Sequence, residues 1–90
     1  MIARPVFYEG RVQGVGFRFT VKQTARGYDV TGWVRNLEDG RVELQVNGET
    51  EEVEGFLTAV TESELKGHIK RVEMHPIPLL EGTRGFDIVR

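Results

Sequence analysis

The chain has 90 residues, of which 39% are hydrophobic and 29% charged, and its formal net charge is −2. This composition supplies one small core and argues against a disordered chain, and the length predicts a single domain over residues 1–90. The absence of cysteine excludes a disulfide scaffold, a thiolate nucleophile and any cysteine-ligated metal site. Because there are also only two histidines, we expect neither a metal nor another cofactor.

Hydropathy and charge also indicate location and partners. No apolar run approaches the roughly 20 residues of a membrane helix, and the first residues lack the apolar stretch of a secretory signal. We therefore expect a soluble cytoplasmic protein that contacts no membrane. A duplex-binding domain is usually clearly basic, so the balanced charge argues against a nucleic-acid partner.

The balanced total hides an asymmetry along the chain. Residues 1–37 carry six basic and two acidic side chains, a net +4, whereas residues 38–90 carry six basic and twelve acidic ones, a net −6. If the protein has an anion site, we expect it in the first segment. The alternative is that these charges are solvated faces, and the charge distribution alone favours this alternative.

The first third of the chain predicts a strand, a loop and a helix. Residues 4–9 have a β-prone centre, and three glycines within residues 10–16 indicate a loop. A helix is predicted over residues 17–26, because apolar residues recur at helical spacing at Phe17, Val21, Ala25 and Tyr28.

The middle of the chain predicts a β-hairpin. Residues 30–37 and 41–47 read as strands, joined by a short turn that ends in Gly40. The second of these strands alternates cleanly, which predicts one buried face (Val42, Leu44 and Val46) and one solvent-facing side (Arg41, Glu43 and Gln45).

The remainder predicts a second helix and two more strands. Residues 50–62 form an amphipathic pattern, residues 69–75 read as a strand, and residues 85–89 read as a short extra strand at the C-terminus. The order βαββαβ plus this extra strand predicts an α+β fold: a ferredoxin-like two-layer sandwich with an antiparallel sheet and both helices on one face. Such a fold hosts many functions, so it does not identify the activity.

The loop after the first strand has the composition of an anion site. It reads Gly10-Arg11-Val12-Gln13-Gly14-Val15-Gly16-Phe17-Arg18. Consecutive N–H groups in a glycine-rich curl can converge on a phosphate, and a following helix adds its N-terminal donors. Arg18 can add a bidentate guanidinium contact. The loop lacks the Gly-Lys-Ser/Thr of a Walker A motif and the third glycine of a dinucleotide motif, but a loop without a ligand remains an alternative.

A second segment, Gly32-Trp33-Val34-Arg35-Asn36, ends the predicted strand before the hairpin turn. Asn36 can both donate and accept hydrogen bonds, so it could orient a water molecule. By itself, however, Asn36 is better explained as an ordinary residue that initiates a turn.

Together, the two segments resemble the signatures of the acylphosphatase family. The first signature contains Gly-x-Val-Gln-Gly-Val-x-Phe-Arg, and here it corresponds to residues 10–18. The second is met by residues 32–36 and by Gly40, Val42 and Gly48. The resemblance covers nearly the whole chain and includes its length and βαββαβ order. It departs at Tyr8, where the family has an aliphatic residue, and at Leu37, where some members have threonine.

The resemblance implies an enzyme that hydrolyses the carboxyl–phosphate bond of acylphosphates to a carboxylate and inorganic phosphate. It implies Arg18 and Asn36 as catalytic residues: Arg18 would bind the phosphoryl oxygens and Asn36 would hold the attacking water. The phosphate would be bound by backbone amides of the loop, from Gln13, Gly14, Val15, Gly16, Phe17 and Arg18. The substrate would be a small molecule, and no metal would take part.

This chemistry is consistent with the residues that the chain lacks. The leaving carboxylate has a conjugate acid with a pKa of about 4, so it departs without protonation. Phosphoryl transfer passes through a loose transition state, so positioning and charge stabilisation dominate.

Two alternatives remain from the sequence. One is an acylphosphatase-like domain that handles carbamoyl phosphate, as in the large hydrogenase-maturation carbamoyltransferase. That protein continues into further modules, and none follows here, which favours a stand-alone enzyme that we expect to be a monomer. The other, from a different class, is a ferredoxin-like module that binds nucleic acid or regulates a partner. The net charge of −2 argues against this second alternative.

Overall fold

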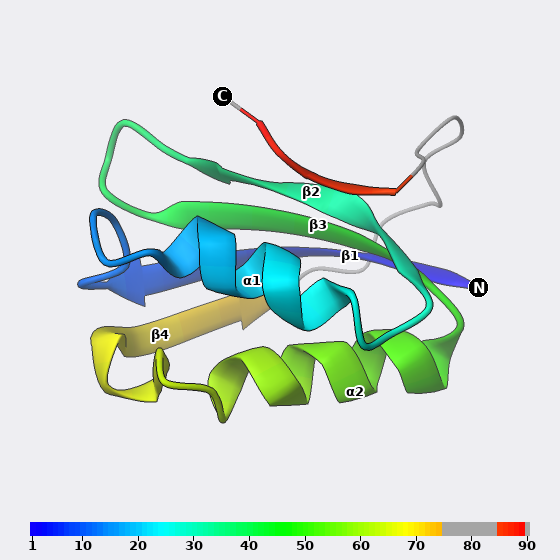
Figure 1. Cartoon of the computed structure of the whole chain (residues 1–90). Helices are drawn as coiled ribbons and strands as arrows, with labels where there is room; N and C mark the ends of the chain where they lie inside the picture. The colour runs from blue at the N-terminus through cyan, green and yellow to red at the C-terminus, as the bar shows by residue number, and fades with distance from the viewer. Residues whose placement is uncertain (75–84, 90) are drawn as a thin grey trace.

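The computed structural model describes residues 1–74 and 85–89. These residues form a single sheet with two α-helices packed on it (Figure 1). In chain order, the elements are β1 (Ile2–Gly10), α1 (Phe17–Ala25), β2 (Val30–Asn36), β3 (Val42–Gly48), α2 (Thr50–Thr61), the 3₁₀ helix η1 (Lys66–His68), β4 (Ile69–Met74) and β5 (Phe86–Ile88).

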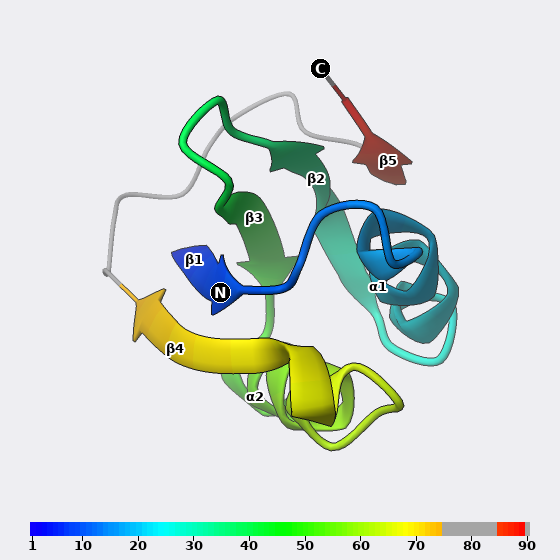
Figure 2. The same cartoon turned by 90° about the vertical axis from the view of Figure 1, so that its left-hand side faces the viewer.

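The strand order in the sheet is β4-β1-β3-β2-β5. The first four strands pair antiparallel throughout, and Figure 2 shows α1 and α2 on the same face of the sheet. The predicted ferredoxin-like fold is therefore confirmed. The extra strand β5 pairs in parallel with β2, so it adds a parallel edge to the antiparallel sheet.

The predicted elements agree with the observed ones to within two residues at each described end. Residue 75, predicted as the end of the fourth strand, lies outside the described residues. The sequence did not predict η1, a single turn before β4 that is too short to show a periodic pattern. The longer α-helix, α2, has 12 residues, and no helix in residues 1–74 or 85–89 meets the length and hydropathy that a membrane span requires.

The hydrophobic core lies between the sheet and the two helices. Alternate residues of β1 and β3 point into it, and the apolar stripes of α1 and α2 cover them. Its largest side chains include Tyr8 and Phe17, whose ring centroids lie 5.0 Å apart. Tyr8 thus fills the position where the family signature has an aliphatic residue, and its ring supports the first residue of α1.

One prediction about β3 is wrong. Gln45 was expected to face solvent, but only 3% of its surface is exposed. β3 is flanked on both sides, and its neighbours in the register at this position are Pro5 in β1 and Trp33 in β2. Such bulky cross-strand neighbours screen a side chain between them. The amide of Gln45 is satisfied in part by a hydrogen bond from its Nε2 to Oδ1 of Asn47, at 3.2 Å.

The strand register brings the two sequence motifs to the same end of the sheet. Tyr8 of β1 pairs with Val42 of β3, and Val42 pairs in turn with Asn36 of β2. Because neighbouring strands are about 4.8 Å apart, the ends of β1 and β2 are roughly 10 Å apart. The loop that follows β1 therefore lies close to Asn36.

The buried hydroxyl of Tyr8 gives a first prediction. Its Oη is buried with no hydrogen-bond partner among the described residues, and burial raises the pKa of Tyr8 well above its usual range. Tyr8→Phe removes this unsatisfied group, so we expect the free energy of unfolding in urea to rise by about 1 kcal/mol. Tyr28→Phe, at a half-buried ring, serves as the control. A loss of stability in Tyr8→Phe would show that the hydroxyl has a partner.

Candidate active site

The glycine-rich loop between β1 and α1 takes a conformation that requires glycine. Gly14 and Gly16 have φ angles of 77° and 75°, in the left-handed region that L side chains rarely adopt. A Cβ atom at either position would have no neighbour within 4 Å. Backbone conformation, and not crowding, therefore demands glycine, and the space beside both residues is open.

Most N–H groups of this loop have no partner in residues 1–74 and 85–89. Among the described residues, no hydrogen bond is donated by the backbone N–H groups of residues 13–19. The first helical bond of α1 runs from the N–H of Thr20 to the carbonyl of Gly16, at 2.9 Å. Such a run of free donors is unusual, because most backbone N–H groups in folded proteins are paired. It leaves up to seven donors for water or an anion.

The charge at the start of α1 favours an anion. Gly16 caps the helix without a side-chain hydrogen bond, and the first turn contains no acidic residue. By contrast, the first turn of α2 contains Glu51 and Glu52, which neutralise the positive end of that helix dipole. Arg18, half-buried in the first turn of α1, forms no ion pair with any described residue. Its guanidinium is therefore available to a ligand.

A pocket of about 190 Å³ lies between the loop, α1 and the end of β2. The buried side chains of Val12 and Phe17 contribute to its lining, as do the backbones of Gly14 and Gly16. Its polar side chains are Arg18 and Asn36, and two exposed apolar side chains, Phe19 and Ile88, complete the lining. The pocket therefore combines free N–H groups, one cation and one amide.

Asn36 brings an unsatisfied acceptor to this pocket. It is the last residue of β2, on the face of the sheet that carries the helices. Its Oδ1 atom is buried and has no hydrogen-bond partner among the residues described. A buried polar atom without a partner is costly, so its retention at a pocket indicates a ligand or water that completes it.

Gln13 fastens the loop to the β2–β3 hairpin. Its side-chain Nε2 donates to the carbonyl oxygens of Leu37, at 2.7 Å, and Arg41, at 3.0 Å. These two residues are themselves joined, because the N–H of Leu37 donates to the carbonyl of Arg41 at 2.8 Å. The side chain of Gln13 thus links the glycine-rich loop to the residue that follows Asn36, and it fixes the loop relative to the hairpin.

The hairpin turn is held by a second set of contacts. Oδ1 of Asp39 accepts a hydrogen bond from the backbone N–H of Arg41 at 3.0 Å, and its Oδ2 accepts one from the Arg41 Nε at 2.7 Å. The backbone hydrogen bond, followed by the one from the guanidinium, lowers the pKa of Asp39 below its usual value. Asp39 therefore stays ionised at neutral pH and keeps the turn closed beside Asn36.

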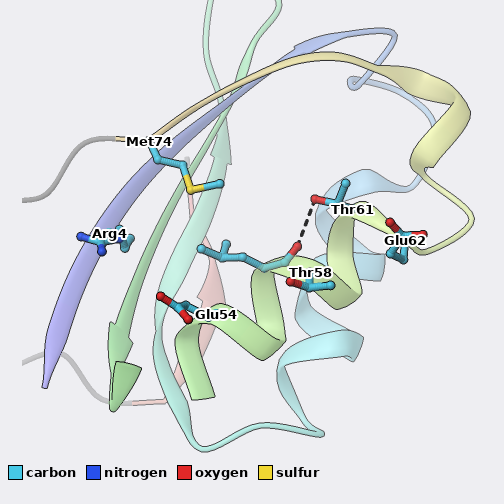
Figure 3. A pocket seen from close by; sticks show the side chains of 7 residues that line it. Arg4, Glu54, Thr58, Thr61, Glu62 and Met74 are labelled. Carbon is cyan, nitrogen blue, oxygen red and sulfur yellow. Dashed lines mark hydrogen bonds between the residues drawn. The ribbon is translucent and has the colours of Figure 1, made fainter. Parts of the chain in front are cut away.

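A larger hollow elsewhere on the molecule lacks these features. It measures about 490 Å³ and lies between α2 and strands β1 and β4, where Arg4 and Met74 face the helix (Figure 3). Arg4 is the one cation among the described residues that line it, and it shares the hollow with the carboxylates of Glu54 and Glu62. Two carboxylates repel an anion, so size alone does not make this hollow a phosphate site.

Comparisons with known proteins agree with the two motifs. The sequence model of the family described as Acylphosphatase matches residues 4–88. An acylphosphatase of Clostridium beijerinckii is 34% identical over 88 residues, and one of Bacillus licheniformis is 36% identical over 88 residues; each alignment covers 98% of this chain and 98% of the relative. The chain belongs to the acylphosphatase family. This is an enzyme family, and the resemblance drawn from the sequence is confirmed.

Solved structures of acylphosphatases share the fold. The crystal structure of acylphosphatase from Bacillus subtilis superposes with a TM-score of 0.91 at 34% identity, covering 100% of both chains. The T. kodakarensis HypF structure matches with a TM-score of 0.86 at 32% identity, but the match covers only 12% of the HypF chain. The acylphosphatase fold thus occurs both alone and as a small part of a larger protein.

The structure brings most of the sequence-predicted acylphosphatase site together. Gly14, Gly16, Phe17, Arg18 and Asn36 all line the same pocket. Two further predicted residues do not line it: the side chain of Gln13 is directed to the hairpin, and the side chain of Val15 is 39% exposed. Their backbone N–H groups belong to the run of free donors described above.

Sequence reasoning missed three lining residues of this acylphosphatase pocket. Val12 belongs to the signature, and its position as an apolar residue between two polar ones could have predicted that it is buried. Phe19 carried a signal, because it is an apolar residue on the otherwise polar side of α1. Ile88 is 52 positions from Asn36 in the sequence, and only the parallel pairing of β5 with β2 brings it to the pocket.

The link made by Gln13 gives a prediction about stability. Gln13→Leu removes two side-chain hydrogen bonds, each worth about 1 kcal/mol, while both carbonyl oxygens keep a backbone donor, so we expect the free energy of unfolding in urea to fall by about 2 kcal/mol. Gln23→Leu is the matched control, because Gln23 is exposed on α1 and should change stability by less than about 0.5 kcal/mol. Equal effects of the two substitutions would contradict the assigned role of Gln13.

Proposed function

We propose that this chain hydrolyses the carboxyl–phosphate bond of acylphosphates, using Arg18 to bind the phosphoryl group and Asn36 to orient the attacking water. The observation that carries the proposal is the meeting of three features in one pocket of an acylphosphatase-family chain: the free N–H groups of residues 13–19, the unpaired guanidinium of Arg18, and the unpartnered Oδ1 of Asn36.

The phosphoryl group would bind in the curl of the loop. The backbone amides of Gln13, Gly14, Val15, Gly16, Phe17 and Arg18 would donate to its oxygens, and the positive end of the α1 dipole would favour its charge. The planar fork of Arg18 can contact two phosphoryl oxygens at once. Because these donors are fixed by the fold before the substrate arrives, they stabilise the charge of the transition state with little reorganisation.

Asn36 would hold the water that attacks phosphorus. Its Oδ1 can accept a hydrogen bond from this water, which fixes the position of the water oxygen. An amide does not take the proton, because it is not a base at neutral pH. Its contribution is therefore orientation, which removes the entropic cost of placing the water in line with the breaking bond.

The proposed reaction balances without a general acid. The bond between phosphorus and the bridging oxygen breaks, and the carboxylate leaves with the electron pair. The water oxygen bonds to phosphorus, one proton stays on it, and the other passes to a non-bridging phosphoryl oxygen. An acylphosphate dianion thus gives a carboxylate and dihydrogen phosphate. The leaving carboxylate is stable because its conjugate acid has a pKa of about 4.

A second candidate is an acylphosphatase-like domain that handles carbamoyl phosphate. The match to a small part of the HypF chain shows that this fold also occurs as a domain of a larger protein, as this alternative requires, and carbamoyl phosphate carries the same phosphoryl group on a small acyl unit. The full-length match to acylphosphatases favours the first proposal. We further propose a cytoplasmic monomer that acts on small molecules and binds no nucleic acid, in keeping with its net charge of −2.

The proposed activity is tested by the release of benzoate from benzoyl phosphate. We expect turnover that is inhibited by inorganic phosphate, because the product occupies the same cradle. We also expect the rate to be unchanged by EDTA, since the leaving group needs no metal. No turnover would contradict the proposed activity, and a loss of rate with EDTA would contradict the metal-independent mechanism.

Arg18→Ala should weaken phosphate binding and slow the reaction together. The substitution removes a charge-assisted contact to the phosphoryl group, so we expect kcat/KM to fall by about a thousandfold and inhibition by inorganic phosphate to weaken. Arg26→Ala, at an exposed residue beyond the end of α1, is the matched control. Equal behaviour of the two variants would exclude Arg18 from the site.

Asn36→Ala should separate binding from rate. Because only the water loses its partner, we expect kcat to fall by about a hundredfold while inhibition by inorganic phosphate stays within about twofold of the parent value. A comparable loss of phosphate inhibition in Asn36→Ala and Arg18→Ala would contradict distinct roles for the two residues.

A further inference from the structure

Exposed apolar side chains gather beside the proposed phosphate site. Among the described residues, five large hydrophobic side chains are exposed: Met1, Val15, Phe19, Met74 and Ile88. Phe19 and Ile88 line the pocket that holds Arg18 and Asn36, and Val15 lies in the loop that forms it. Isolated exposed hydrophobic residues need no explanation, but a concentration of them at one pocket does.

The fold does not account for Phe19 in this position. The buried stripe of α1 consists of Phe17, Val21 and Ala25, and at 100° per residue Phe19 lies about 200° from Phe17. Phe19 is 62% exposed and does not belong to the core cluster. It therefore adds little to stability, and its ring presents apolar surface directly after the residue proposed to bind the phosphoryl group.

Ile88 provides a second apolar surface from a distant part of the chain. It pairs with Val34 in the parallel register of β5 with β2, two residues before Asn36. Ile88 is 38% exposed and also lies outside the core cluster. Side chains from α1 and β5 thus contribute apolar surface to a pocket whose other lining is backbone, a cation, an amide and two buried side chains.

An acylphosphate bound by the loop would place its acyl group near these apolar side chains. The acyl carbon is one bridging oxygen away from phosphorus, so a phosphoryl group held by the loop places the acyl group within a few ångströms of the same pocket. Of the described residues that line the pocket, only Arg18 is charged, and it is assigned to the phosphoryl group. The lining therefore offers nothing to pair with a second anionic group, and it offers Phe19 and Ile88 to an apolar one.

We propose that Phe19 and Ile88 form an acyl-group subsite that selects acylphosphates with an apolar acyl group, aromatic or branched aliphatic. The inference rests on the proposed acylphosphate hydrolysis and adds the substrate class. Contact with the aromatic face and the aliphatic side chain removes apolar surface of both partners from water, which stabilises the bound substrate.

The subsite is tested by comparing benzoyl phosphate with acetyl phosphate. The two share the phosphoryl group and differ in the apolar surface of the acyl group. We expect Phe19→Ser to lower the ratio of their kcat/KM values, benzoyl over acetyl, by about tenfold relative to the parent protein, and Ile88→Ser to lower it by a smaller factor. Intrinsic reactivity differences between the substrates cancel in this comparison of ratios.

Two controls separate a subsite from general damage. Phe19→Leu retains an apolar side chain and should restore most of the ratio, and Met74→Ser changes another exposed hydrophobic residue, outside this pocket, and should leave the ratio unchanged. Inhibition by inorganic phosphate should stay within twofold in Phe19→Ser, because the loop and Arg18 are intact.

The outcomes distinguish the two proposals. A selective loss with benzoyl phosphate, with phosphate inhibition retained, supports the subsite. Turnover of both substrates with an unchanged ratio in Phe19→Ser, or with an equal loss on both, overturns the subsite while the proposed hydrolysis stands. Failure of the parent protein to hydrolyse either substrate overturns the proposed function, and the subsite falls with it.

Discussion

The candidate site depends on one link, the side chain of Gln13 between the glycine-rich loop and the β2–β3 hairpin. The N–H of Arg11 and the buried side chain of Val12 hold the start of the loop, but within the described part of the chain residues 13–19 donate no backbone hydrogen bond. Gln13 donates to the carbonyls of Leu37 and Arg41, and these two residues are paired with each other. The loop is therefore anchored to the strand end that carries Asn36, and its N–H groups stay free.

Around this link, the molecule departs from the usual local rules. Helix α1 begins without a side-chain cap or an acidic residue, Asn36 keeps a buried acceptor without a partner, and Phe19 exposes an aromatic ring. Each departure has an energetic cost, and these three meet at one pocket, although Oη of Tyr8 and Nδ2 of Asn47 are also buried without a partner among the described residues. Helix α2, away from this pocket, also lacks a side-chain cap, but acidic residues occupy its first turn. Departures concentrated in this way are typical of functional sites, where a ligand completes the missing interactions.

The distribution of charge supports the same conclusion. The excess of basic residues in the first 37 positions does not form a broad basic face. Arg35 forms an ion pair with Glu43, and Lys22 forms one with Asp87. Arg4 lies away from the pocket, in the hollow beside α2. Arg11 and Arg26 also have no ion pair among the described residues, but neither lines the pocket, whereas Arg18 lines it at the positive end of α1. One cation among the described lining residues, beside a row of N–H groups, suits a small anion.

The α-helices, the strands, the fold class and the family could all be predicted from the sequence alone. Local spacing predicted the helices and strands to within two residues at their described ends, because periodic burial is encoded residue by residue. The two motifs also contained Arg18 and Asn36. Other features depend on long-range pairing and are seen only in the tertiary structure. The strand register connects Asn36 to Tyr8 through Val42, and it buries Gln45 between two strands. Gln13 forms its two hydrogen bonds with the hairpin, and the pairing of β5 with β2 places Ile88 near Asn36. These contacts join residues far apart in the chain, so no local pattern in the sequence records them.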